Sequence, residues 1–336
     1  MNARIVDRNK SYFAEVYAKK YNEAFDPDPS PESIMKAITQ ADQEEREEQI
    51  EADERVAREF ESEYEYEEEY YYSHIESDSE LRDVVRTWFQ EGPDRQILER
   101  KYGHIKDWSF SENVIDMSHL FSNKIMFNED ISEWDVSDVQ DFSYMFDGAS
   151  SFNKNISDWD LFSCGYMKCM FRGASSFNQP INRWAENTCG VDDMSFMFHG
   201  ASSFNKDLSN WNVTYVRNMQ SMFEGAIAFN KNIGGWKVER VTNMQSMFSG
   251  AVEFNQDISM WVVGEVTDMS GMFEGASSFN QDIRRWNVKK VTDMRSMFRG
   301  ASSFNYQIGS RWFVDGAVVV DRLNMFQDTT FIEEVD

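Results

Sequence analysis

The apolar positions of this sequence recur with a period of 25 to 27 residues over most of the chain. Each repeat reads Phe-Asn-x-x-Ile-x-x-Trp-x-Val-x-x-Val-x-x-Met-x-x-Met-Phe-x-Gly-Ala-x-x, with fixed apolar positions and variable polar ones. A period of this length is typical of proteins that stack one short structural unit many times. The tryptophans that mark the register are Trp108, Trp134, Trp159, Trp184, Trp211, Trp236, Trp261, Trp286 and Trp312.

The methionine-rich part of the repeat has the spacing of a short helix. Met244, Met247, Phe248 and Ala251 fall at i, i+3, i+4 and i+7, the apolar stripe of two helical turns, and Asn243 can cap the start. A glycine follows at a fixed place, where a helix would end with a residue at positive φ. These glycines are Gly148, Gly173, Gly200, Gly225, Gly250, Gly275 and Gly300, and the first copy has Asn123 there.

The segment Ile-x-x-Trp-x-Val is short and rich in β-forming residues, so we expect a strand with Trp and Val on one side. A unit with one short strand and one short helix cannot bury its own apolar face, whereas stacked copies can. The pattern therefore predicts an α/β repeat solenoid of about nine coils with short parallel strands and short helices.

Two runs, residues 266–273 and 272–283, resemble the repeat of BspA-like leucine-rich-repeat surface proteins. Repeats of that family occur in bacterial surface lipoproteins, algae and large DNA viruses. The resemblance covers residues 79–336 and implies a leucine-rich-repeat-like solenoid that acts in adhesion or protein binding, without known catalysis. The chain has neither the signal peptide nor the lipid-anchor cysteine of the bacterial members.

A solenoid needs a cap on its first coil, and the sequence predicts a helical one. After Ser79, a good N-cap, an apolar stripe begins, and Gly92 and Pro93 end this helix. A second short helix is expected through Ile97 and Leu98. The stripe consists of Leu81, Val84, Val85, Trp88 and Phe89.

These patterns divide the chain into five segments. Residues 1–30 are expected to form a helical tether, and residues 31–78 an acidic helix followed by a linker rich in Glu and Tyr. Residues 79–107 are the helical cap, residues 108–311 the repeats, and residues 312–336 a degenerate last coil.

The net charge of −26 is concentrated before the repeats, since residues 41–80 carry 18 acidic and 3 basic residues. This balance argues against binding to nucleic acid or to an anionic membrane. The acidic arm is either a solvated linker or a docking segment for a basic partner, with tyrosine phosphorylation as a further option. It consists of Glu63, Tyr64, Glu65, Tyr66, Glu67, Glu68, Glu69, Tyr70, Tyr71 and Tyr72.

No pattern of catalytic, metal-binding or cofactor-binding residues stands out, so we expect no enzyme and no cofactor. The paired methionines fit a core better than a soft-metal site, and the Asn of each Phe-Asn pair fits a ladder that caps turns. Asp or Asn two residues later leaves a weak calcium option. Cys164, Cys169 and Cys189 are too few for a disulfide framework, and buried thiols are expected.

The residues on either side of each Trp are expected to face outward, since side chains alternate along an extended segment. Their character changes along the repeats from acidic to basic with apolar members. This is either ordinary surface variation or a graded face on which a partner docks in one polarity. The candidates are Glu133, Asp135, Asp158, Asp160, Arg183, Lys237, Met260, Val262, Arg285, Arg311 and Phe313.

Two functions fit these observations. The first is a non-catalytic protein-interaction or scaffold solenoid with the acidic arm as a docking element. The alternative is a structural component of a large assembly, such as a minor capsid-type protein of a virus particle, tethered through its N-terminal segment. With no signal peptide or membrane span in the sequence, an intracellular or virion-associated location is expected, and the oligomeric state stays open.

Overall fold

The computed structural model describes residues 72–186, 190–305, 312 and 321–329, together with the single positions 40, 43 and 55. The chain divides into two compact units, Met1–Tyr71 and Tyr72–Asp336. Nearly all described residues belong to the second unit, and the fold below is that of this unit. The segments predicted for residues 1–71 lie outside the described part except at those three positions.

Two α-helices precede the repeats, α3 (Asp78–Trp88) and α4 (Pro93–Tyr102), and two short 3-10 helices follow, η1 (Ile105–Asp107) and η2 (Asn182–Glu186). Both predicted helices are therefore present. The predicted N-cap Ser79 is wrong, because the N-cap is Ser77, whose hydroxyl accepts the N–H of Glu80, the third residue of the helix. The stripe is buried as expected apart from Phe89, which ends α3 and is 37% exposed.

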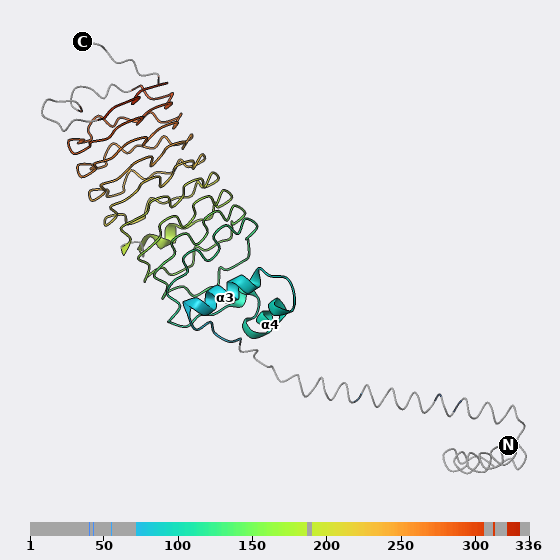
Figure 1. The fold of residues 1–336 in the computed structure, drawn as a ribbon. Coiled ribbons are helices and arrows are strands. Elements are labelled where there is room, and N and C mark those ends of the chain that lie inside the picture. Colours follow the sequence, from blue (N-terminus) through green and yellow to red (C-terminus); the bar gives the residue numbers. More distant parts are fainter. Residues whose placement is uncertain are drawn as a thin grey trace, which may run out of the picture. The chain divides into compact units, whose positions relative to one another are not determined.

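Helix α3 takes the place of a coil before the first repeat (Figure 1). The Asp78 carboxylate accepts the N–H groups of Ile115 and Asp116 at 2.9 and 3.0 Å. In the next coil the equivalent N–H groups donate to a backbone carbonyl of the coil before. Arg82 in turn donates to the carbonyl of Ser118 at 2.7 Å. The side chains of α3 thus satisfy backbone groups that would otherwise be orphaned at the edge.

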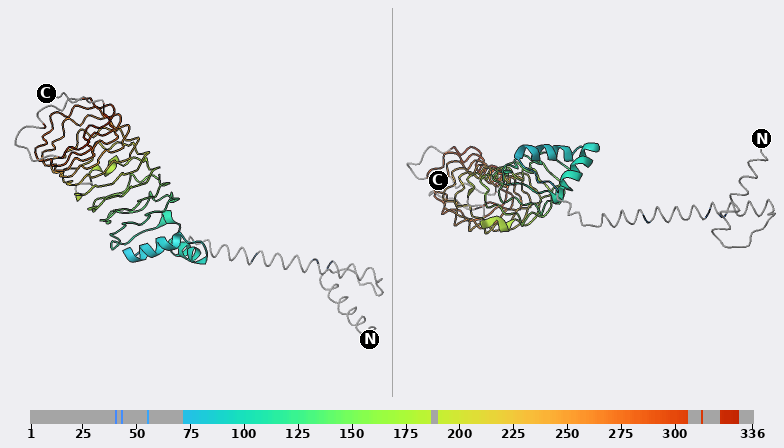
Figure 2. Two further views of the ribbon diagram at one scale, coloured as in Figure 1. Left: turned by 45° about the horizontal axis from the view of Figure 1, so that its top comes forward. Right: turned by 90° about the horizontal axis from the view of Figure 1, so that it is seen from below.

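The repeats follow one another in chain order as a stack of coils, with α3 and α4 at one end (Figures 1 and 2). Neighbouring coils are joined by isolated parallel bridges at one repeat position, which holds Asp or Asn in most copies and Tyr166 in one, and which precedes the first Met in most copies. The bridged pairs are Asp116 with Asp141, Asp141 with Tyr166, Asp193 with Asn218, Asn218 with Asn243, Asn243 with Asp268, Asp268 with Asp293, and Asp293 with Asp321.

The predicted helix in each repeat is wrong: none of the described Met-Phe segments is helical. Alternate N–H groups donate to the next coil, as from Met244 to Asp268 at 3.0 Å and from Ser246 to Ser270 at 2.8 Å. Ser246 has φ of +53° and Gly250 φ of +67°, so left-handed residues recur every four positions. The predicted positive φ at the glycines and at Asn123 is confirmed, although no helix ends there.

The predicted strand at Ile-x-x-Trp-x-Val is also wrong, because each end of this segment is a turn. In the coil of Trp236, the Trp236 N–H donates to Ile233 and the Val241 N–H donates to Val238, both at 3.0 Å. Trp236 and Val238 nevertheless both point inward, at 4% and 1% exposure. The expected pairing of inward Trp and Val is therefore confirmed without a regular strand.

The core consists of aromatic ladders that run from coil to coil. Phe rings of the Met-Phe pairs stack with centroids 5.5–5.7 Å apart. Phe rings of the Phe-Asn pairs stack at 5.6–6.1 Å. The methionines pack among them with almost no exposure. Because each ring contacts both neighbouring coils, burial in this core depends on stacking.

Two polar ladders lock the register of the stack. From Trp134 to Trp286, the indole N–H of each repeat Trp donates to a carbonyl one coil back, as from Trp236 to Leu208 at 2.9 Å. The amide oxygen of each Asn in the Phe-Asn pairs accepts the N–H of the next Asn, as Asn230 does from Asn255 at 3.1 Å. The predicted asparagine ladder is confirmed, and it gives a backbone donor of each coil a partner in the coil before it.

Candidate interaction surface

The residues directly before and after each Trp from Trp134 to Trp286 form an exposed strip along the stack, here called the tryptophan edge. All are exposed except Ala185 and Asn212, which are half-buried. Met260 and Val262 are apolar and yet 74% and 56% exposed. The described members are Glu133, Asp135, Asp158, Asp160, Arg183, Ala185, Asn210, Asn212, Gly235, Lys237, Met260, Val262, Arg285 and Asn287.

The position after Trp has a structural role in several coils. The side chains of Asp135, Asp160, Asn212 and Asn287 each accept the backbone N–H of the residue two places on, at 3.0–3.4 Å. This is an Asx turn, which explains why Asp or Asn is favoured at this position. Local backbone geometry therefore accounts for these four residues, and they give no indication of a binding protein.

Lys237 and Val262 occupy the same position but cannot make this turn, since neither side chain carries an acceptor. Lys237, Arg285 and Lys289 form no ion pair with the described residues. The tryptophan edge therefore presents Lys237 and Arg285, neither in an ion pair within the described part of the chain, in the coils before and after that of Met260 and Val262, with Lys289 two residues beyond the edge position Asn287. No structural requirement of the repeat explains Lys237 and Val262.

The opposite part of the edge is acidic. Glu133, Asp135, Asp158 and Asp160 lie exposed in two successive coils. Asp158 forms an ion pair with Arg183 of the next coil, so part of this charge is compensated within the edge. Across the described repeats the edge thus changes from acidic to cationic and apolar.

Several sequence candidates cannot be placed. Arg311, Phe313 and residues 63–71 of the acidic arm lie outside the described residues. Tyr72, the last residue of the arm, is described and is 36% exposed. Its ring lies against Gly103, where any added Cβ would meet the ring at 2.7 Å.

The carboxylates of the calcium option are engaged in turns. Asp130, Asp257 and Asp282 each accept the N–H two residues on, at 2.9–3.1 Å. A side-chain hydrogen bond from Arg284 lowers the pKa of Asp282 to about 2. Within the described part of the chain, no group of three or more His, Cys, Asp or Glu is placed to hold a metal ion.

The described thiols are buried. Cys164 and Cys169 are free, at 4% and 1% exposure, and Cys189 lies outside the described residues. Burial raises the pKa of Cys164 to about 12, so its thiol stays protonated and weakly nucleophilic at neutral pH. The expected burial of these two residues is confirmed.

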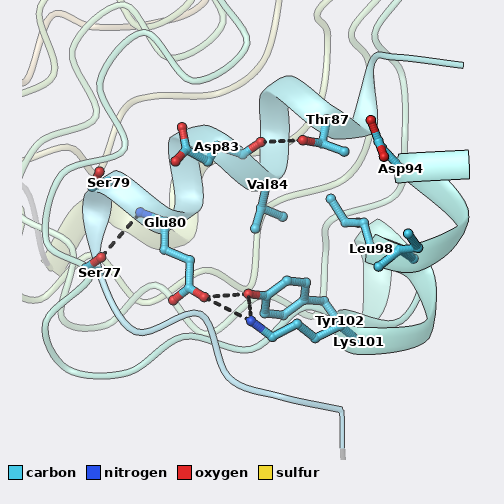
Figure 3. Close-up of a pocket in the computed structure, with 11 residues that line it drawn as sticks. Ser77, Ser79, Glu80, Asp83, Val84, Thr87, Asp94, Leu98, Lys101 and Tyr102 are labelled. Carbon is cyan, nitrogen blue, oxygen red and sulfur yellow. Dashed lines mark hydrogen bonds and ion pairs between the residues drawn. The ribbon is translucent and has the colours of Figure 1, made fainter. Parts of the chain in front are cut away.

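A groove with a volume of about 660 Å³ lies between α3 and α4 (Figure 3). Val84 and Leu98 lie at its floor and Ile97, 62% exposed, beside them. Asp83 and Asp94 contribute carboxylates, one from each helix. The sequence did not single out this groove, because it depends on how the two helices pack.

One wall of the groove is a hydrogen-bonded set of three side chains (Figure 3). The Tyr102 hydroxyl donates to Glu80, and the Lys101 ammonium donates to the Tyr102 oxygen at 2.5 Å. The bond from Tyr102 holds the pKa of Glu80 below its ordinary value, and burial raises the pKa of Tyr102. All three groups are therefore engaged with one another.

The described residues include no helix long and apolar enough to cross a membrane. Comparison with known protein families gives a match to a family described as "Mycoplasma protein of unknown function, DUF285". The match occurs three times in tandem, over residues 94–190, 185–266 and 231–335. No curated protein and no solved structure matches the chain.

Proposed function

Because the chain belongs to the DUF285 family of repeat proteins, whose function is unknown, we propose that it is a protein-binding scaffold that docks partners along the tryptophan edge. In this proposal the acidic arm is a second docking element for a basic surface. The stack of coils is, in the same proposal, a solenoid of the BspA-like leucine-rich-repeat kind. In the described residues its coils contain no α-helix and are joined by isolated bridges.

One observation carries the proposal. The interior of each described repeat is nearly constant, whereas the tryptophan edge changes from acidic to cationic and apolar along the stack. Lys237 and Val262 replace the Asp or Asn that would make the local turn, so the repeat itself gives no reason for them. Exposed Met260 and Val262 flanked by cations supply the apolar centre and charged rim common in protein interfaces.

The partner expected from this chemistry places an acidic, apolar segment on the coils of Trp236, Trp261 and Trp286. Apolar contact with Met260 supplies affinity, while cation–carboxylate attraction sets orientation and association rate. The acidic coils at the other end of the edge favour basic residues of the partner. Together the two ends of the edge allow the partner to bind in only one direction along the stack.

The test is charge reversal at the cationic end of the edge, Lys237→Glu and Arg285→Glu, together with Lys289→Glu two residues beyond the edge position Asn287. The three side chains are exposed, so the fold should tolerate the change. Binding to a partner isolated with the wild-type chain is expected to weaken at least about tenfold, a loss of about 1.4 kcal/mol, measured by titration calorimetry at physiological salt.

A matched control carries the same change of charge elsewhere. Lys154, Lys206 and Lys231 occupy the position after each Phe-Asn pair, away from the tryptophan edge, and are half-buried. Their reversal to Glu should leave the affinity within about twofold. Equal weakening by both triple variants would show a non-specific charge effect, and unchanged affinity in the edge variant would reject the proposal.

A further inference from the structure

The groove between α3 and α4 is a second candidate binding surface. Capping the first coil does not depend on it. Val84 and Leu98 are buried as part of the helix contact, at 5% and 6% exposure. Ile97 lines the same groove and is 62% exposed. An apolar side chain from a partner would cover Ile97 and reach Val84 and Leu98.

Among the charged side chains that line the groove, the acidic ones outnumber the basic one. Lys101 is the one cation among the residues that line the groove, and its ammonium already bonds to Tyr102 and lies 3.4 Å from Glu80. The wall formed by Glu80, Lys101 and Tyr102 is therefore close to neutral. The charge left over comes from Asp83 on α3 and Asp94 on α4.

These two carboxylates are available to an incoming cation. Asp83 pairs with Arg86, but both side chains are about two-thirds exposed, at 64% and 67%, so water and salt screen this pair. Asp94 lies in the first turn of α4 and forms no ion pair with the described residues. A guanidinium or ammonium could bond to either carboxylate while the apolar neighbour of that cation covers Ile97.

We propose that this groove binds a short segment of another protein in which Lys or Arg stands next to a large apolar residue. The apolar side chain covers Ile97, Val84 and Leu98, and the cation pairs with Asp83 or Asp94. The site is independent of the tryptophan edge, since it is formed by α3, its N-cap Ser77 and α4, and its charge preference is opposite to that of the cationic end of the edge.

The experiment is a selection from a random peptide display library on the full chain, followed by synthesis of the most enriched peptide. Enriched sequences are expected to share a basic residue beside an apolar one. The synthetic peptide should bind with an affinity that falls as salt increases, measured by fluorescence anisotropy.

Substitutions in the groove then test whether the peptide binds there. Asp83→Asn with Asp94→Asn, and separately Ile97→Ser, should each weaken binding at least about tenfold while the melting temperature stays near that of the wild type. Glu91→Gln with Asp107→Asn removes two exposed charges outside the groove and should change affinity less than about twofold.

Three results would overturn the proposal. One is that no peptide is enriched, and another is that the enriched peptides are acidic or lack charge. The third is that the groove variants bind the peptide as well as the control does. The triple variant of the tryptophan edge should bind this peptide normally, so the two proposals stand or fall separately.

Discussion

Asparagine and aspartate hold the backbone of each repeat at three separate places. In the coil that begins at Phe254, Asn255, Asp257 and Asp268 each accept a backbone N–H, two within the coil and one from the next coil. These residues combine a short side chain with an acceptor, which suits turns where no regular ladder forms. The polar pattern is therefore as structural as the apolar one.

At Asp257, the contribution of the hydrogen-bond acceptor can be separated from that of the negative charge. Hydrogen bonds from the side chain and backbone of Ser259 hold its pKa below the ordinary value. A lowered folded pKa contributes stability above the ordinary value, which is lost as pH falls through the folded value. Asp257→Asn keeps the acceptor, so stability at pH 7 should be unchanged within about 0.5 kcal/mol. Below about pH 4 the variant should lose less stability than the wild type.

Thermal unfolding followed at pH 7 and again near pH 3 measures this difference. Asp138→Asn is the matched control, because its exposed carboxylate forms no hydrogen bond with the described residues. A larger loss of stability at low pH in Asp257→Asn than in the wild type would contradict the assignment.

The reactivity of the Cys164 sulfur is a test of how well the core is buried. With a pKa of about 12 against an ordinary value of 9.0, its thiolate fraction at pH 8 is about a thousandfold lower than in an unfolded chain. Alkylation by iodoacetamide, followed by peptide mass spectrometry, should be slow in the native protein and fast in guanidinium. Equal rates in the two conditions would place this thiol in solvent.

At the scale of the element, the Met-Phe segment shows how a helical pattern can arise without a helix. Inward positions at i, i+3, i+4 and i+7 also fit a backbone with a left-handed residue every four positions. Its hydrogen bonds run between coils and not from i to i−4. Ser246 and Gly250 mark the two left-handed positions in one repeat.

Substitution of Ser246 distinguishes the two conformations. Gly adopts positive φ without steric cost, and Gly271 occupies the same position in the next coil. Ser246→Gly should therefore maintain or raise the melting temperature, and Ser246→Val should lower it. In a helix, Ser→Gly would cost several tenths of a kcal/mol, so a clear loss in Ser246→Gly would favour the helix.

These elements also show what the sequence can and cannot reveal. The repeat period, the inward Trp and Val, the positive φ at Gly250 and the asparagine ladder follow from residue type and spacing. The hydrogen bonds between coils do not, because the partner of Ser246 is Ser270 in the next repeat and a single repeat contains no sign of it. The groove at Ile97 depends on the packing of α3 against α4 and was missed for a similar reason.

At the scale of the whole molecule, each described coil contacts its neighbours through the same ladders, so differences between coils lie mainly on the surface. The tryptophan edge is where these differences form a gradient, from Glu133 and Asp135 to Met260 and Arg285. A long surface of this kind can read the order of charges on an extended partner. The groove between α3 and α4 adds a separate site whose charge preference is opposite to that of the cationic end of the edge.

Site-specific photo-crosslinking to the bound partner tests docking along the tryptophan edge most directly. A photoreactive phenylalanine replaces Met260 on the edge in one variant and Lys231 in the other. The account predicts strong crosslinks from position 260, mapped by mass spectrometry to an acidic, apolar segment of the partner, and weak crosslinks from position 231. Crosslinks from position 231 with none from position 260 would contradict it.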